Sequence, residues 1–189
     1  MDGPCSHVKS SEVCDCSSKP SSCAQSLTEM DFERGIWQAA LDGNLNRVRT
    51  LLDKGGDPDA RDGSGYTALH YASRSGYEDV CQLLLEQGAD VNARTRSGKV
   101  SSLHRAAYSG HTAVVRLLIK YGADLQLLDS DGQTPLHKAT QKMQKEVVRL
   151  LIGLDSSLTK VRDKNGRLPA DVVPSNELEM LDMLQHEYK

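Results

Sequence analysis

Three six-residue stretches decide the fold: TALHYA at 67–72, SSLHRA at 101–106 and TPLHKA at 134–139. Each sets a histidine directly after a leucine, and the three histidines lie 34 and then 33 residues apart: His70, His104, His137. Self-similarity at a fixed period of this size is typical of a protein built from repeated structural units. We therefore expect the histidines to hold equivalent places in successive units and to belong to the scaffold.

The copy at 65–92 shows how one unit is built. Thr67 is a good N-cap for a short helix, and Gly76 can take the left-handed geometry that ends it. Apolar residues at i, i+3 and i+4 then predict a second helix over about 78–87: Val80, Leu83, Leu84. Turn-forming residues follow and predict a hairpin that leads to the next unit. Neither helix can bury its apolar face alone, so the units must be stabilised by stacking.

The same unit returns along most of the chain, with one extra residue before Leu103 and with Ile36-Trp37 in place of Leu-His in the first copy. Terminal copies face water on one side, so departures from the pattern are expected there. The phrases predict these boundaries: a degenerate N-terminal capping repeat at 30–62, repeats at 63–95, 96–128 and 129–162, and a C-terminal capping repeat at 163–188.

The recurring phrases G-x-T-P-L-H-x-A, G-H-x-x-V-V-x-L-L and G-A-D-V-N-A resemble the signature of ankyrin repeats, over residues 32–185. The resemblance implies an all-α repeat solenoid of about four repeats plus a C-terminal cap, in which helix pairs alternate with β-hairpin loops. It implies that the repeat histidines tie neighbouring repeats together by hydrogen bonds. It also implies a protein-binding role, with partners held by the hairpin tips and by the first helix of each repeat.

The composition and the motifs argue against several classes of function. With 26 acidic and 23 basic residues the net charge is −3, which argues against a general affinity for nucleic acid. No G-x-S-x-G, P-loop or helix-opening G-x-G-x-x-G pattern is present. Cys81 lies on an apolar helix, where a buried and inert thiol is the default. We therefore expect a non-enzymatic, monomeric scaffold or adaptor that needs no cofactor.

The sequence also bears on location. No apolar run approaches the ~20 residues that a membrane span needs. The first twenty residues lack the apolar core of a secretory signal. We expect the protein in the cytoplasm, the nucleus or both, with its cysteines reduced.

Residues 1–28 differ from the rest, because Ser, Thr, Cys and Pro interrupt every apolar pattern. We expect a disordered Cys/Ser-rich tail. Five side chains in it could bind a metal: Cys5, His7, Cys14, Cys16, Cys23. Their spacing matches no common zinc module, so zinc binding as a regulatory element is the alternative to a tail without metal. Acylation of Cys14 or Cys16 is a further alternative, with no second membrane signal to support it.

Asn92 follows Asp90 and Val91 and lies eight residues after Leu84, in a pattern similar to the asparagine-hydroxylation consensus of ankyrin repeats. The same residues suit a turn, because asparagine tolerates left-handed geometry and bonds its own backbone. Hydroxylation of Asn92 and a purely structural turn are therefore both open.

The binding positions of the family, carried over repeat by repeat, give a candidate partner-binding set: Tyr66, Tyr71, Arg74, Arg96, Lys99, Arg105, Tyr108, Lys138, Lys142. Six of these are cations, and Asp131 is the one carboxylate assigned to the same surface. We predict a basic, tyrosine-bearing concave face that binds an acidic or phosphorylated segment of a protein partner. RNA or anionic lipid headgroups are the alternative ligands of this face.

Two departures from the repeat put parts of this face in question. The extra residue near Val100 leaves the place of Lys99 uncertain. Met143 stands where other copies have a glycine between their helices, and positive φ is costly for such a residue. We therefore expect this turn to be rearranged and Lys142 to be redirected.

Overall fold

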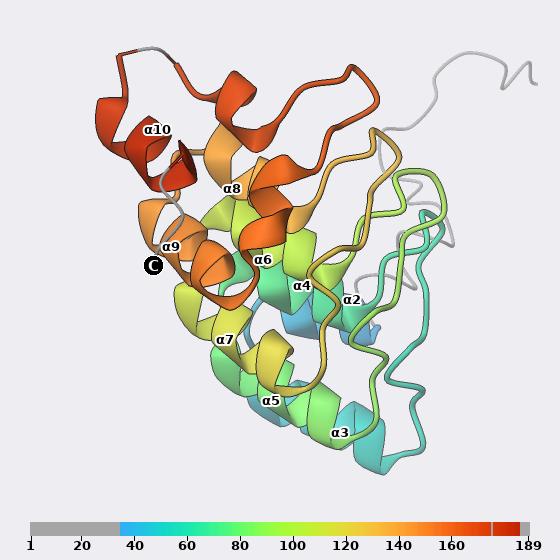
Figure 1. The fold of residues 1–189 in the computed structure, drawn as a ribbon. Coiled ribbons are helices and arrows are strands. Elements are labelled where there is room, and N and C mark those ends of the chain that lie inside the picture. The colour runs from blue at the N-terminus through green and yellow to red at the C-terminus, as the bar shows by residue number, and fades with distance from the viewer. Residues whose placement is uncertain (1–34, 175, 186–189) are drawn as a thin grey trace, which may run out of the picture.

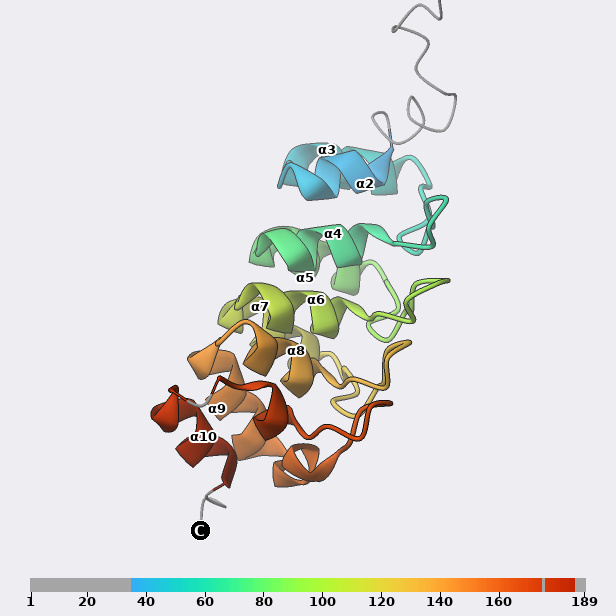
Figure 2. The same cartoon turned by 90° about the horizontal axis from the view of Figure 1, so that it is seen from above.

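The computed structural model describes residues 35–174 and 176–185. Within them, helix pairs follow one another: α2 (Ile36–Leu41) with α3 (Leu45–Asp53), α4 (Ala68–Ser75) with α5 (Glu78–Glu86), α6 (Ser102–Ser109) with α7 (Thr112–Lys120), and α8 (Pro135–Gln141) with α9 (Lys145–Leu154). Two 3₁₀ helices and a last α-helix complete the described part of the chain: η1 (Ser156–Lys160), η2 (Pro169–Val172) and α10 (Leu178–Gln185). The pairs stack in chain order, and the loops between pairs project to one side of the stack (Figures 1 and 2). The predicted all-α repeat solenoid is confirmed.

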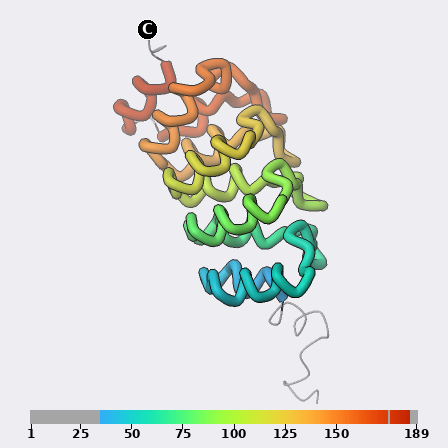
Figure 3. The backbone as a smooth tube through the Cα atoms, turned by 90° about the horizontal axis from the view of Figure 1, so that it is seen from below, coloured from blue at the N-terminus to red at the C-terminus, as the bar shows by residue number. Residues whose placement is uncertain are grey.

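The helices form two layers, which can be followed in Figure 3 as a continuous stack. The first helices of the pairs pack on one another and are called the inner helices: α2, α4, α6, α8. The second helices form the other layer and are called the outer helices: α3, α5, α7, α9. None of the helices in the described residues has the length and apolar character to span a bilayer.

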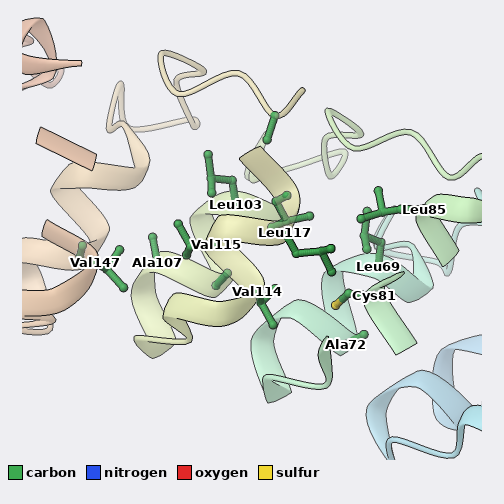
Figure 4. Close-up of a cluster of buried hydrophobic side chains, with 14 of the residues drawn as sticks. Leu69, Ala72, Cys81, Leu85, Leu103, Ala107, Val114, Val115, Leu117 and Val147 are labelled. Carbon is green, nitrogen blue, oxygen red and sulfur yellow. The ribbon is translucent and has the colours of Figure 1, made fainter. Parts of the chain in front are cut away.

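Leucines at equivalent places fill the space between the layers. On the inner helices Leu69, Leu103 and Leu136 are at most 1 % exposed, and their counterparts on the outer helices are fully buried: Leu84, Leu118, Leu151. Figure 4 shows part of this core, with side chains from α4 to α7 and from α9. Burying one leucine contributes roughly 1.5–3 kcal/mol, and stacking is what buries these.

The inter-helix turn that contains Met143 keeps the form of the other turns, so the expected rearrangement is wrong. Met143 adopts φ +56°, in the left-handed region that Gly110 occupies at φ +82° in the preceding repeat. The Gln144 backbone N–H donates to the Ala139 carbonyl at 3.0 Å, as the corresponding His111 N–H does to Ala106 at 3.1 Å. The left-handed turn is therefore kept although its residue disfavours it.

The C-terminal cap departs from the helix pair of the other repeats. The 3₁₀ helix η2 packs against α8 in place of a further inner helix and begins at Pro169. Helix α10 buries an apolar stripe: Met180, Met183, Leu184. Glu179 of α10 also forms exposed ion pairs with Lys145 and Arg149 of α9.

Candidate partner-binding face

Each repeat histidine joins a helix cap to the next repeat. The Nδ1 atom of His70 accepts hydrogen bonds from the Thr67 backbone N–H at 3.2 Å and from its hydroxyl at 2.9 Å. The Nε2 atom lies 3.0 Å from the Val100 carbonyl oxygen of the next repeat. Because a carbonyl can only accept, Nε2 carries the proton and the ring is neutral. Two further sets repeat this geometry: Ser101–His104–Gln133 and Thr134–His137–Arg167.

The surroundings of these histidines keep them uncharged. Burial lowers the pKa of His70 and of His104 to about 4, although the hydrogen bond to the neighbouring carbonyl acts in the opposite direction. Burial lowers the pKa of His137 in the same way. Both ring nitrogens of each histidine are engaged within the scaffold, so no nitrogen is left for a ligand.

Three of the predicted tyrosine and arginine side chains form a cluster across the first two full repeats: Tyr66, Tyr71 and Arg105. The Arg105 guanidinium carbon lies 4.9 Å from the centroid of the Tyr66 ring, and an Arg105 nitrogen donates to the Tyr66 hydroxyl. The Tyr71 ring lies 5.6 Å from that of Tyr66, and its hydroxyl donates to Asp62 at 2.6 Å. The structure thus brings these three predicted residues together.

A second cation and aromatic pair lies one repeat further on. The Lys142 ammonium lies 4.8 Å from the centroid of the Tyr108 ring, and that ring is 40 % exposed. Lys142 therefore stays on the face of the inner helices despite the unusual residue at position 143. Arg74, at the end of α4, is exposed.

Lys138 is a structural cation, which changes the charge expected for this face. Its ammonium forms an ion pair with Asp129 at 2.6 Å and donates to the Gln133 amide oxygen at 2.7 Å. Asp129 is almost fully buried, and burial opposes its ionisation; the Lys138 and Gln133 contacts nevertheless hold the pKa of this carboxyl below its usual value. Asp62 and Asp129 therefore add two carboxylates that the sequence count left out.

Lys99 also differs from the prediction, because it does not take the place in the repeat that was expected for it. The inserted residue is absorbed in the hairpin, where Lys99 adopts φ +48°. The Thr95 N–H donates to the Val100 carbonyl, as the Asp62 N–H does to the Tyr66 carbonyl in the preceding repeat. Val100 and not Lys99 therefore takes the place of Tyr66, and Lys99 is exposed on the hairpin. Arg96 is also exposed there.

Asn92 uses its side chain to join two hairpins. Its amide nitrogen donates to the Gly122 carbonyl at 3.2 Å, and its amide oxygen accepts from the Asp124 N–H at 2.9 Å. The Asp90 side chain in turn accepts from the Asn92 backbone N–H. This geometry accounts for an asparagine at the position, and hydroxylation stays a prediction.

The structure describes Cys81 but not the predicted metal ligands of the N-terminal segment. Cys81 is buried, its Sγ lies 3.6 Å from the Ser73 hydroxyl, and burial raises the pKa of the thiol to about 12. The predicted tail at 1–28 lies outside the described residues, together with its candidate ligands: Cys5, His7, Cys14, Cys16, Cys23. Within the described part, no three His, Cys, Asp or Glu side chains are grouped as a metal would require.

The sequence prediction missed a row of arginines along the hairpins. Arg61 donates to the Arg94 carbonyl at 2.7 Å, and Arg94 donates to the Leu128 carbonyl, each reaching the equivalent residue of the next repeat. The equivalent residue of the next hairpin is Leu128, and Arg162 holds the same place on the C-terminal cap. The signal was present in the sequence, because each of these residues directly precedes the first polar residue of its hairpin turn, such as Asp62.

Comparison with known proteins gives one family and several relatives. A model of ankyrin repeats, described as three copies, matches residues 14–95 and again 97–186. Human ankyrin repeat domain-containing protein 39 is 58% identical over 83 residues, which are 42% of this chain and 45% of the relative. An ankyrin repeat-containing protein of Schizosaccharomyces pombe is 30% identical over 141 residues, 75% of this chain and 50% of the relative. Human protein phosphatase 1 regulatory subunit 27 is 39% identical over 67 residues, 35% of this chain and 44% of the relative. The chain thus spans at most about half the length of these relatives.

Proposed function

Because the chain belongs to the ankyrin-repeat family, we propose that it is a non-enzymatic adaptor that holds an acidic segment of a partner protein on its inner helices. Repeats of this family form protein-interaction modules, and the proposal adds the surface and the chemistry of the partner. The observation that carries it is the pair of cation and aromatic contacts, Arg105 on Tyr66 and Lys142 on Tyr108.

The chemistry of these contacts suits an acidic partner. Tyrosine and arginine dominate binding hot spots, because they give large contact areas and directional hydrogen bonds. Holding a cation over an aromatic ring restricts the side chain before the partner arrives, which lowers the entropy cost of binding. Arginine can pair with a carboxylate or a phosphate through two parallel hydrogen bonds.

Three cations of this face remain available for a partner. Among the described residues, Arg74, Arg105 and Lys142 form no ion pair with a carboxylate, whereas Lys138 does. The Arg105 Nε atom is buried and has no hydrogen-bond partner in the described chain. That atom is closed to a docked ligand, so a partner carboxylate would pair with the other guanidinium nitrogens of Arg105.

One relative is compatible with such a role. Protein phosphatase 1 regulatory subunit 27 carries the name of a regulatory subunit, and its match to this chain covers 67 residues. We take from it the class of function, a non-catalytic subunit that acts through another protein, and not the identity of the partner.

Charge reversal on the inner helices tests the proposal. We expect Arg74→Glu combined with Lys142→Glu to weaken capture of the partner from cells roughly tenfold or more, since both changes place carboxylates against an acidic segment. The matched control is Arg116→Glu with Lys120→Glu on outer helix α7, which makes the same change in net charge at exposed positions. Quantitative mass spectrometry of the tagged full chain gives the readout. Equal recovery with both double variants, at unchanged melting temperature, would rule the inner helices out.

A further inference from the structure

A groove crosses three successive hairpins on the C-terminal half of the stack. Its volume is about 420 Å³, and the hairpins at 94–100, 128–133 and 162–167 contribute its walls. The hairpins are fixed to one another by backbone hydrogen bonds, from the Ser130 N–H to the Gly98 carbonyl at 2.8 Å and from the Lys164 N–H to the Asp131 carbonyl at 2.9 Å. A ligand would therefore meet a surface that is already ordered.

The lining of this hairpin groove is basic on its exposed side. Its cations are Arg94, Lys99, Arg162 and Lys164, and none of them forms an ion pair with a described carboxylate.

The two carboxylates of the lining face inward. Asp129 is paired with Lys138, and Asp163 accepts from the Arg167 guanidinium at 2.8 Å. Both aspartates are 5% exposed, so Asp131 is the exposed carboxylate of these three hairpins. The cations thus outnumber the acids that a ligand would meet.

The groove also has an apolar centre at a defined register. The same backbone hydrogen bond opens each hairpin, from Thr95 to Val100, from Asp129 to Gln133 and from Asp163 to Arg167. The residue before each of these donors is therefore equivalent from one hairpin to the next: Arg94, Leu128, Arg162. Leu128 is 40% exposed in the lining. The row reads cation, apolar, cation.

The spacing of the row matches an extended polypeptide. Packed helices lie about 8–10 Å apart, so equivalent residues of stacked repeats are separated by about that distance. An extended chain advances about 3.3 Å per residue, and three residues therefore span one repeat. We propose that the hairpin groove binds an extended segment of a partner protein with the pattern acidic–x–x–apolar–x–x–acidic. Its acidic side chains pair with the cations on either side of Leu128, one with Arg94 and Lys99 and the other with Arg162 and Lys164. Its apolar side chain contacts Leu128. This site lies on the hairpins and does not depend on binding at the inner helices.

A titration of the labelled full chain with two short peptides tests this pattern. One peptide is Gly-Glu-Ser-Gly-Leu-Ser-Gly-Glu-Gly, and its matched control has the same composition with the two glutamates adjacent. We expect the amide resonances of the three hairpins to shift with the spaced peptide, and its affinity to exceed that of the control several-fold. Equal affinities would overturn the proposed register, and shifts confined to the inner helices would overturn the site.

Substitutions test which side chains bind the spaced peptide. Lys99→Glu with Lys164→Glu changes two exposed hairpin residues, and we expect it to weaken the spaced peptide about tenfold. Leu128→Ser should weaken binding of the spaced peptide several-fold at unchanged charge, whereas Arg116→Glu with Lys120→Glu on outer helix α7, outside both surfaces, should leave it unchanged. Retained binding in the Lys99/Lys164 variant would contradict the proposal. Tighter binding of single-stranded RNA than of the spaced peptide, lost in that variant but not in Leu128→Ser, would assign the groove to a polyanion instead.

Discussion

At the scale of single residues, each repeat histidine makes two structural contacts, one through each ring nitrogen. Nδ1 closes a helix N-terminus, and Nε2–H reaches a carbonyl of the next repeat, as with His104 and Gln133 at 3.0 Å. In the first repeat Trp37 replaces the histidine, and its Nε1–H donates at 2.9 Å to the Ala60 carbonyl. The indole donates to the loop just before the following hairpin, and it gives up the cap because it has a donor but no acceptor.

The neutral histidines predict that stability depends on pH. The pKa of His70 and of His104 is about 4 in the folded chain against an ordinary value of 6.5. The unfolded chain therefore binds protons that the folded chain does not, and the free energy of unfolding falls as the pH falls from 6.5 to 4. The loss approaches about 3 kcal/mol for each of these two histidines. Urea unfolding at pH 7, 6 and 5 measures it.

A histidine variant serves as the control for this prediction. His104→Gln can keep the capping interaction with Ser101, since glutamine is a usual partner in a capping box, but it does not titrate. We expect its stability to depend less steeply on pH than that of the wild type. Identical stability of the wild type at pH 7 and pH 5 would contradict the assignment.

At the scale of elements, the turns of the first three helix pairs are each covered by a side chain of the next pair. A Cβ on Gly76 would lie 2.5 Å from the His111 ring, and one on Gly43 would lie 2.6 Å from the Tyr77 ring. The His111 ring also contacts the Arg74 carbonyl through Nε2 at 3.0 Å. Absence of a side chain at these glycines therefore serves the packing between repeats as well as the left-handed backbone.

Two glycine-to-alanine substitutions distinguish the effects of repeat packing and left-handed backbone from the effect of helix propensity. Gly76→Ala forces an alanine into φ +84° and against His111, and we expect it to lower the free energy of unfolding by about 2 kcal/mol. Gly153→Ala lies in α9, where an added Cβ meets nothing within 4 Å, and should raise it by about 0.5 kcal/mol. Chemical denaturation of both variants gives the comparison; a neutral Gly76→Ala would show that the His111 contact is dispensable.

The elements were predictable from the sequence where the information is local. Thr67 and Pro135 mark helix starts, and both stand where predicted, as the N-cap of α4 and the first residue of α8. The pairing of Lys138 with Asp129 was not predictable, because the sequence of a helix does not show whether a lysine is free at the surface or paired with a buried carboxylate. The conflict at Met143 was anticipated, but the sequence did not show that the turn would keep its left-handed form.

At the scale of the whole molecule, neighbouring repeats are tied together by contacts of a few recurring kinds. Histidine to carbonyl, Asn92 to the following loop and arginine to the next hairpin each cross one interface. Contacts of this kind make a rigid stack with two long surfaces, the inner helices and the hairpins. The sequence predicts such a stack. It does not predict the charge that each surface presents, because that charge depends on which cations and carboxylates pair with one another when the repeats stack.

The central claim is that a partner protein contacts the inner helices, and site-specific photo-crosslinking tests it most directly. A benzophenone amino acid would replace Tyr108 on α6 in one variant and Arg116 on α7 in the other, both exposed positions in the same repeat. We expect irradiation in cells to give a discrete adduct of one partner from position 108 and none from position 116. An adduct from position 116 alone would place the partner on the outer helices and contradict the account.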